Sequence, residues 1–178
     1  MAQPIHPPAN VRDRADEALA FAMQHKGAPE VAMPEHMRIL QPTDFSTEAE
    51  AAEAEAVRLA RSFGAELIVL HVSVEAVLYG ETPFGATQLG QVYEAQASWA
   101  ESRLAERAQA LQGQGVRASW RRRVGVPHEE IVKAAEEERA SYIVIGSHGR
   151  GGFARFMLGS VADRVVRTAT CPVIIVRP

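Results

Sequence analysis

Two hydrophobic patterns alternate along the chain from Met37 onward. Short, nearly continuous apolar runs, such as residues 66–72, are typical of strands that a sheet buries on both faces. Between these runs, apolar residues recur every three or four positions, as in residues 89–111, which predicts amphipathic helices. The predicted strands are residues 38–40, 66–72, 118–124, 141–145 and 172–176. The predicted helices are residues 47–63, 89–113, 127–139 and 161–169.

The regular alternation of strand and helix indicates βαβ crossovers and therefore a parallel sheet with helices on both faces. We expect an α/β fold, a doubly wound five-stranded parallel sheet with the strand order 3-2-1-4-5. Sheets of this kind bind ligands beyond the carboxyl ends of their strands, where the winding direction reverses. Two such strand ends carry candidate residues, Thr43-Asp44 after the first strand and a glycine-rich loop from Gly146 after the fourth.

Residues 1–36 differ in composition from the rest of the chain, because five prolines surround one helical stretch. That stretch covers residues 11–25, with Asn10 as a candidate N-cap and Gly27 at its end. We interpret residues 1–36 as an N-terminal extension with one helix, which either docks on the domain formed by residues 37–178 or is exchanged with a partner.

Composition and charge narrow the classes of function. The 178 residues are 47% hydrophobic and carry a formal net charge of −3, which argues against a dedicated nucleic-acid binder and against disorder. The single cysteine, Cys171, cannot form an internal disulfide, and no apolar run approaches the ~20 residues that span a bilayer. We therefore expect a cytoplasmic protein without nucleic-acid or membrane partners. The triplet Arg121-Arg122-Arg123 is interpreted as a sheet edge with solvated side chains.

The segment from Gly146 to Ser160 connects a buried strand to a helix and is rich in glycine. Glycines allow a backbone to approach a ligand closely and to reach positive φ. The amides of Gly159, Ser160 and Val161 at a helix N-terminus predict an anion site, and Arg150 is placed to offset phosphate charge. The alternative is a flexible loop whose glycines merely permit turns.

The glycine spacing of this loop, Gly146-x2-Gly149-x9-Gly159-Ser160, resembles the G-x2-G-x9-G-[S/T] signature of the universal stress proteins, specifically their ATP-binding branch. The first strand with its acidic end and the last strand are also similar to that family. The resemblance covers residues 37–178 and excludes the N-terminal extension. It implies a nucleotide-binding domain in stress response or signalling, whose ligand is ATP, alone or with Mg.

The resemblance also implies which residues contact the nucleotide. The base and ribose would be lined by Pro42, Thr43, Asp44, Val72, Ile145 and Gly146. The phosphates would be held by Gly149, Arg150, Gly159, Ser160 and Val161. On local grounds Asp44 is as well explained as a turn or cap residue, and His148 is interpreted as a solvated loop residue without a catalytic role.

A homodimer is the implied assembly, joined through the C-terminal strand, residues 172–176. That strand lies at one edge of the expected sheet, is apolar throughout and has no lysine or inward charge to protect it. Such an edge presents unpaired backbone groups to another chain. The alternative is that the N-terminal helix covers the edge and keeps the chain monomeric.

Several motifs of catalysis are missing from the sequence. The only lysines, Lys26 and Lys133, are far from the glycine-rich loop, so a P-loop hydrolase is excluded. No G-x-G-x-x-G follows the first strand, and neither H-E-x-x-H nor paired cysteines occur. We assign no catalytic residue and no metal site. The sequence predicts ATP binding with slow or no turnover; the alternatives are a nucleotide-free protein-interaction module of the same fold and, third, a small adenine-nucleotide hydrolase.

Overall fold

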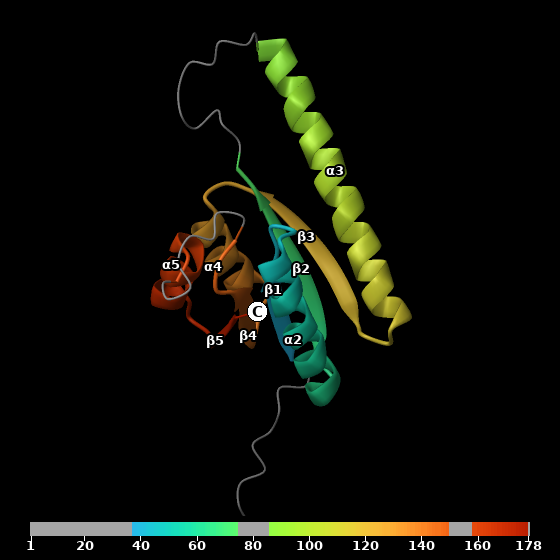
Figure 1. Cartoon of the computed structure of the whole chain (residues 1–178), viewed down its shortest axis with the longest axis vertical. Coiled ribbons are helices and arrows are strands. Elements are labelled where there is room, and N and C mark those ends of the chain that lie inside the picture. The colour runs from blue at the N-terminus through green and yellow to red at the C-terminus, as the bar shows by residue number, and fades with distance from the viewer. Residues whose placement is uncertain (1–36, 75–85, 150–157, 178) are drawn as a thin grey trace, which may run out of the picture. The chain divides into compact units, whose positions relative to one another are not determined.

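Parallel strands form one five-stranded sheet in the computed structural model, which describes residues 37–74, 86–149 and 158–177. The strand order is β3-β2-β1-β4-β5 (Figure 1). The strands are β1 (Arg38–Pro42), β2 (Glu66–Ser73), β3 (Ala118–Val124), β4 (Tyr142–Gly146) and β5 (Val173–Val176). The doubly wound α/β fold and the strand order expected from the sequence are confirmed.

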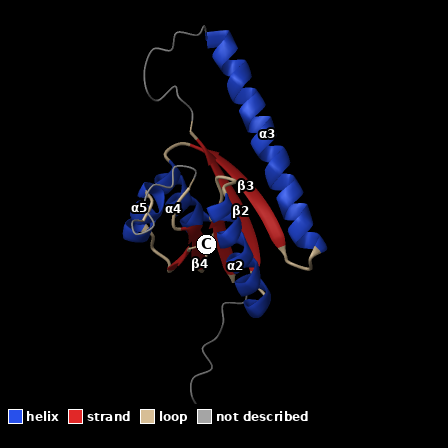
Figure 2. Ribbon diagram, in the orientation of Figure 1, coloured by secondary structure: helices blue, strands red, loops and turns tan. Residues whose placement is uncertain are grey.

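Helices cover both faces of this sheet (Figure 2). They are α2 (Thr47–Phe63), α3 (Ala86–Gly113), α4 (Pro127–Glu137) and α5 (Ser160–Thr168). α2 and α3 form one core with the sheet, in which Leu67 packs with Leu104. α4 and α5 form the other core, in which Ile68 packs with Ile131. Because successive side chains of a strand point to opposite faces, β2 supplies both cores and its central residues are fully buried.

The sequence of α2 explains where this helix begins and ends. The Ser46 side chain accepts a hydrogen bond from the Ala49 amide, as expected of an N-cap, and Gly64 ends the helix with φ 60°. The face toward the sheet is made of alanines at three- and four-residue spacing, namely Ala49, Ala52, Ala56 and Ala60. These small side chains let α2 approach the sheet closely near the ends of β1 and β4.

The arginine triplet of β3 does lie at a sheet edge, but its side chains are not simply solvated. Arg121 pairs with Glu138, and Arg122 pairs with Glu101 of α3. Arg123 pairs with two glutamates of α4, and its hydrogen bond lowers the pKa of the Glu137 carboxyl below its ordinary value. The arginine side chains are therefore ion-paired as well as partly exposed, which the interpretation as solvated charges did not include.

Other element boundaries agree closely with the sequence pattern. α3 begins at Ala86, three residues before the predicted start, and β1 extends two residues further, to Pro42. Across the ranges that the structure describes, no helix is both long and apolar enough to cross a membrane. Residues 36–178 make up one compact unit, and the helix expected over residues 11–25 lies outside the described residues.

Candidate functional site

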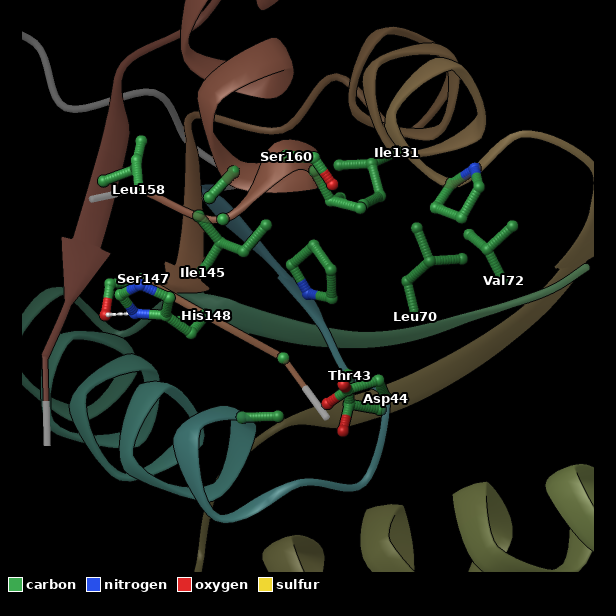
Figure 3. A pocket seen from close by; sticks show the side chains of 18 of the residues that line it. Thr43, Asp44, Leu70, Val72, Ile131, Ile145, Ser147, His148, Leu158 and Ser160 are labelled. Carbon is green, nitrogen blue, oxygen red and sulfur yellow. Dashed lines mark hydrogen bonds between the residues drawn. The ribbon is translucent and has the colours of Figure 1, made fainter. Parts of the chain in front are cut away.

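A cavity of about 610 Å³ opens at the carboxyl ends of β1, β2 and β4 (Figure 3). The N-terminal turns of α4 and α5 and the residues that follow β4 complete its wall. Ten sequence-predicted site residues line it: Pro42, Thr43, Asp44, Val72, Ile145, Gly146, Gly149, Gly159, Ser160 and Val161. The remaining one, Arg150, lies outside the described residues. The cavity is thus where β1 has β2 on one side and β4 on the other, the point at which the winding reverses.

The lining that the structure describes is mainly apolar. Further residues line the cavity although the sequence did not predict them there: Ala49, Leu70, Val74, Pro127, Ile131, Ser147, His148, Leu158 and Ala162. Among the described lining residues, Asp44 is the only acidic one and none is lysine or arginine. The described part of the chain holds no group of three His, Cys, Asp or Glu residues that suits a metal ion. Such a cavity can bury an apolar ring and orient the polar groups attached to it.

The contribution of α4 was missed by sequence reasoning, although a signal for it existed. Pro127 at the first position of α4 follows β3 after a two-residue turn, and Ile131 lies one turn further along the helix. A helix that begins directly after a strand begins at the carboxyl end of that strand. The boundary between β3 and α4 therefore placed both residues at the edge of the sheet where the cavity opens.

Asp44 is both a turn residue and a cavity residue. Its Oδ1 accepts hydrogen bonds from the Ser46 amide (3.1 Å) and the Ser46 hydroxyl (2.5 Å). The same hydroxyl accepts a hydrogen bond from the Ala49 amide (3.2 Å). The carboxylate thereby closes an Asx-turn and braces the N-cap of α2, while the residue faces the cavity. Asp44 is thus a turn residue, as one of the two sequence-based alternatives had it, and its position in the cavity lining is compatible with the other, a contact to a nucleotide, which stays a prediction.

The three motif glycines serve close packing within the protein, and none of them has a positive φ. A Cβ atom on Gly146 would lie 2.9 Å from the carbonyl oxygen of Glu48, at the start of α2. A Cβ on Gly149 would lie 2.6 Å from Oδ2 of Asp44. Gly146 allows the end of β4 to approach the first turn of α2, and Gly149 allows the residues after β4 to approach the turn after β1.

The N-terminus of α5 provides backbone amides at the cavity, but not the full set expected. The Gly159 amide donates a hydrogen bond to the Ser147 carbonyl oxygen (2.8 Å), so it is already engaged within the loop. The first hydrogen bond of the helix runs from Asp163 to Gly159 (2.9 Å). The amides of Ser160, Val161 and Ala162 therefore lack acceptors inside the helix. Of the three amides predicted to hold an anion, those of Ser160 and Val161 are without a helical acceptor and that of Gly159 is engaged; the anion site itself stays a prediction.

His148 is not the solvated loop residue expected from the sequence. It is half-buried, and its Nδ1 lies 3.1 Å from the hydroxyl oxygen of the buried Ser147. Its Nε2 is also buried and has no hydrogen-bond partner within the described residues. In Figure 3 the Ser147 and His148 side chains lie together, across the cavity from Thr43 and Asp44. Sequence reasoning missed this burial because nothing in the residues next to His148 indicates it.

Comparisons with known proteins give a consistent result. The model of the Universal stress protein family matches residues 35–177. A universal stress protein of Methanocaldococcus jannaschii is 32% identical over 142 residues, which cover 80% of this chain and 82% of that protein. The solved structure of universal stress protein UspA from Lactobacillus plantarum has a TM-score of 0.71 and 29% identity, covering 79% of this chain and 97% of that one.

The similar solved structures include the universal stress protein from Archaeoglobus fulgidus in complex with dAMP. Its TM-score is 0.54 at 26% identity, and the match covers 78% of this chain and 96% of that one.

Replacing Gly146 with alanine tests the packing of the loop on α2. Because the new Cβ would meet a backbone carbonyl at 2.9 Å, we expect Gly146→Ala to lower the free energy of unfolding by about 1–3 kcal/mol, measured by urea denaturation. Gly113→Ala is the matched control, since no atom lies within 4 Å of its added Cβ and the residue is helical. The control should be neutral or slightly stabilising. Equal effects of the two substitutions would contradict the packing argument.

Proposed function

Because the chain belongs to the universal stress protein family, we propose that it binds ATP in the cavity described above and hydrolyses it slowly or not at all. The observation that carries this proposal is the difference between two parts of the cavity. Its wall is apolar along β2 and α4, and the N-terminus of α5 lines another part. An adenine ring matches the apolar part, and phosphates match a helix N-terminus. The bound dAMP of the Archaeoglobus fulgidus relative supports an adenine nucleotide as the ligand class.

The base and ribose would lie at the end of the cavity formed by β1, β2 and α4. Val72 and Ile131 supply apolar contacts there, and Pro42 ends β1 beside them. The Asp44 carboxylate lies next to these residues, where it can accept a hydrogen bond from a sugar hydroxyl. Adenine recognition in this arrangement depends on shape and burial more than on charge.

The phosphates would lie at the opposite end, at the start of α5. The amides of Ser160, Val161 and Ala162 point toward the helix N-terminus, where the dipole favours an anion. The Ser160 hydroxyl is exposed and supplies a further donor. Since the described lining offers a single carboxylate and no cluster of metal ligands, a Mg²⁺ ion would be held mainly by the phosphate oxygens and would neutralise their charge.

Slow turnover follows from the groups that the cavity supplies. Phosphoryl transfer is accelerated by a metal-holding carboxylate and by a residue that orients the nucleophile at the γ-phosphate. Asp44, the acidic residue of the described lining, is engaged by Ser46 in the turn after β1. This arrangement favours a protein that carries or senses ATP. A cytoplasmic role in stress response or signalling belongs to the same proposal, supported by family membership.

A homodimer through β5 is part of the proposal. β5 is an edge strand and all of its residues are apolar. The carbonyl oxygens of Pro172 and Val176 accept hydrogen bonds from the amides of Ile143 (3.0 Å) and Ser147 (2.8 Å). The backbone groups of these two residues therefore point toward β4. Because backbone groups alternate in direction along a strand, Val173 and Ile175 direct their N–H and C=O groups away from β4. Those groups can pair with the β5 strand of a second copy.

Calorimetric titration with ATP tests the nucleotide site. We expect Asp44→Ala to weaken ATP binding by about 1–3 kcal/mol, the range for losing a hydrogen bond to a charged group. Asp44→Asn keeps an oxygen that can accept from Ser46 and should preserve the turn while still weakening binding. Asp163→Ala, which removes an exposed carboxylate outside the cavity, is the control and should bind ATP at least as tightly as the wild type. A wild-type chain that binds no ATP would instead support the nucleotide-free interaction module.

Proline substitutions in β5 test the dimer by light scattering. Ile175→Pro removes an N–H that points away from β4 and should give a folded monomer. Ile175→Ala removes the same side chain but keeps the N–H, so it should remain dimeric. Ile174→Pro removes an N–H that faces β4 and should instead lower the stability of the domain. A wild-type chain that stays monomeric at high micromolar concentration would refute the dimer.

A further inference from the structure

The turn after β1 is held by hydrogen bonds to the end of β2. The Thr43 amide donates a hydrogen bond to the Leu70 carbonyl oxygen (2.8 Å), and the Thr43 carbonyl oxygen lies 2.8 Å from Nδ1 of His71. Because a carbonyl oxygen only accepts, Nδ1 of His71 must carry the proton and donate it. Both backbone groups of a cavity residue are therefore fixed by the end of β2.

Phe45, the residue after Asp44, has a backbone conformation that aromatic residues rarely adopt. Its φ is 62°, in the left-handed region, where the Cβ of an L-residue crowds the backbone. Its amide donates to the Thr43 hydroxyl oxygen (3.0 Å). Its ring packs against the His71 ring, with centroids 4.8 Å apart, and against the Trp99 ring of α3, edge to face at 5.2 Å. The ring contacts hold a backbone geometry that the residue alone would avoid.

We propose that His71 and Phe45 are positioning residues for the nucleotide, which act by fixing the Thr43-Asp44 turn. Neither is among the described residues that line the cavity, so they act through the backbone on either side of Asp44. The placement of Asp44 has little tolerance, because Oδ2 lies 2.6 Å from the site of a Cβ on Gly149. A shift of the turn would displace the carboxylate from the sugar or move it into the loop after β4. This inference rests on the proposed nucleotide function.

Two substitutions of His71 separate its hydrogen bond from its ring. His71→Phe keeps a ring against Phe45 but loses the donor, and should weaken ATP binding by at least about tenfold in calorimetry. His71→Asn loses the ring but keeps an N–H donor at the position of Nδ1, and should bind ATP more tightly than His71→Phe. A merely structural role would lower the free energy of unfolding in both variants without this difference in affinity.

Two substitutions of Phe45 separate its ring from its backbone. Phe45→Gly removes the ring and also the penalty of a positive φ, whereas Phe45→Ala removes the ring and keeps the penalty. We expect both variants to bind ATP more weakly, with Phe45→Gly the more stable of the two in urea. ATP affinity equal to the wild type in Phe45→Gly would show that the ring does not position the turn.

Hydrogen exchange of the ligand-free protein gives a readout that does not depend on ATP. The amides of residues 43–46 should exchange faster in His71→Phe than in the wild type and His71→Asn. Unchanged exchange in His71→Phe, or wild-type ATP affinity in that variant, overturns the positioning role while leaving the ATP site intact. A wild-type chain that binds no ATP overturns the proposed function and, with it, this inference.

Discussion

The close approach of the end of β4 to the start of α2 is the constraint on which the site depends. Gly146 lies so near the Glu48 carbonyl that no Cβ fits without a shift. On one side of this contact α2 begins at the Ser46 cap, which the Asp44 carboxylate braces. On the other side the loop turns back, and the Gly159 amide bonds to Ser147 before α5 begins. The two polar ends of the cavity, Asp44 and the α5 amides, are therefore placed by one packing contact.

A parallel sheet makes such an arrangement useful. β1 lies between β2 and β4, and the helices after β1 and β3 cover opposite faces, so the edge between them stays open. The apolar wall comes from β2 and α4, while the amides come from α5. The nucleotide binding that we propose would then need few charged side chains from the described residues. It relies on burial at one end and oriented backbone groups at the other.

The fold was predictable from the sequence because it depends on local signals. Buried strands, alternating helices, the Ser46 cap and the Gly64 terminus are each encoded within a few residues, and the glycine spacing of the loop indicated the family. What could not be predicted are side-chain contacts that depend on how the elements pack together. These include the burial of His148, the pairing of the β3 arginines with α3 and α4, and the left-handed Phe45 between His71 and Trp99. The glycines illustrate the difference, since their positions were predictable but their close packing against α2 and the turn after β1 was not.

Hydrogen exchange measured with and without ATP tests the central claim most directly, because the proposal assigns the phosphates to particular amides. Bound ATP should slow exchange at residues 160–162, at the start of α5, and at residues 43–46, with little change along the far half of α3. Slowed exchange confined to other segments, or no change at saturating ATP, would contradict the assignment of this cavity as the nucleotide site.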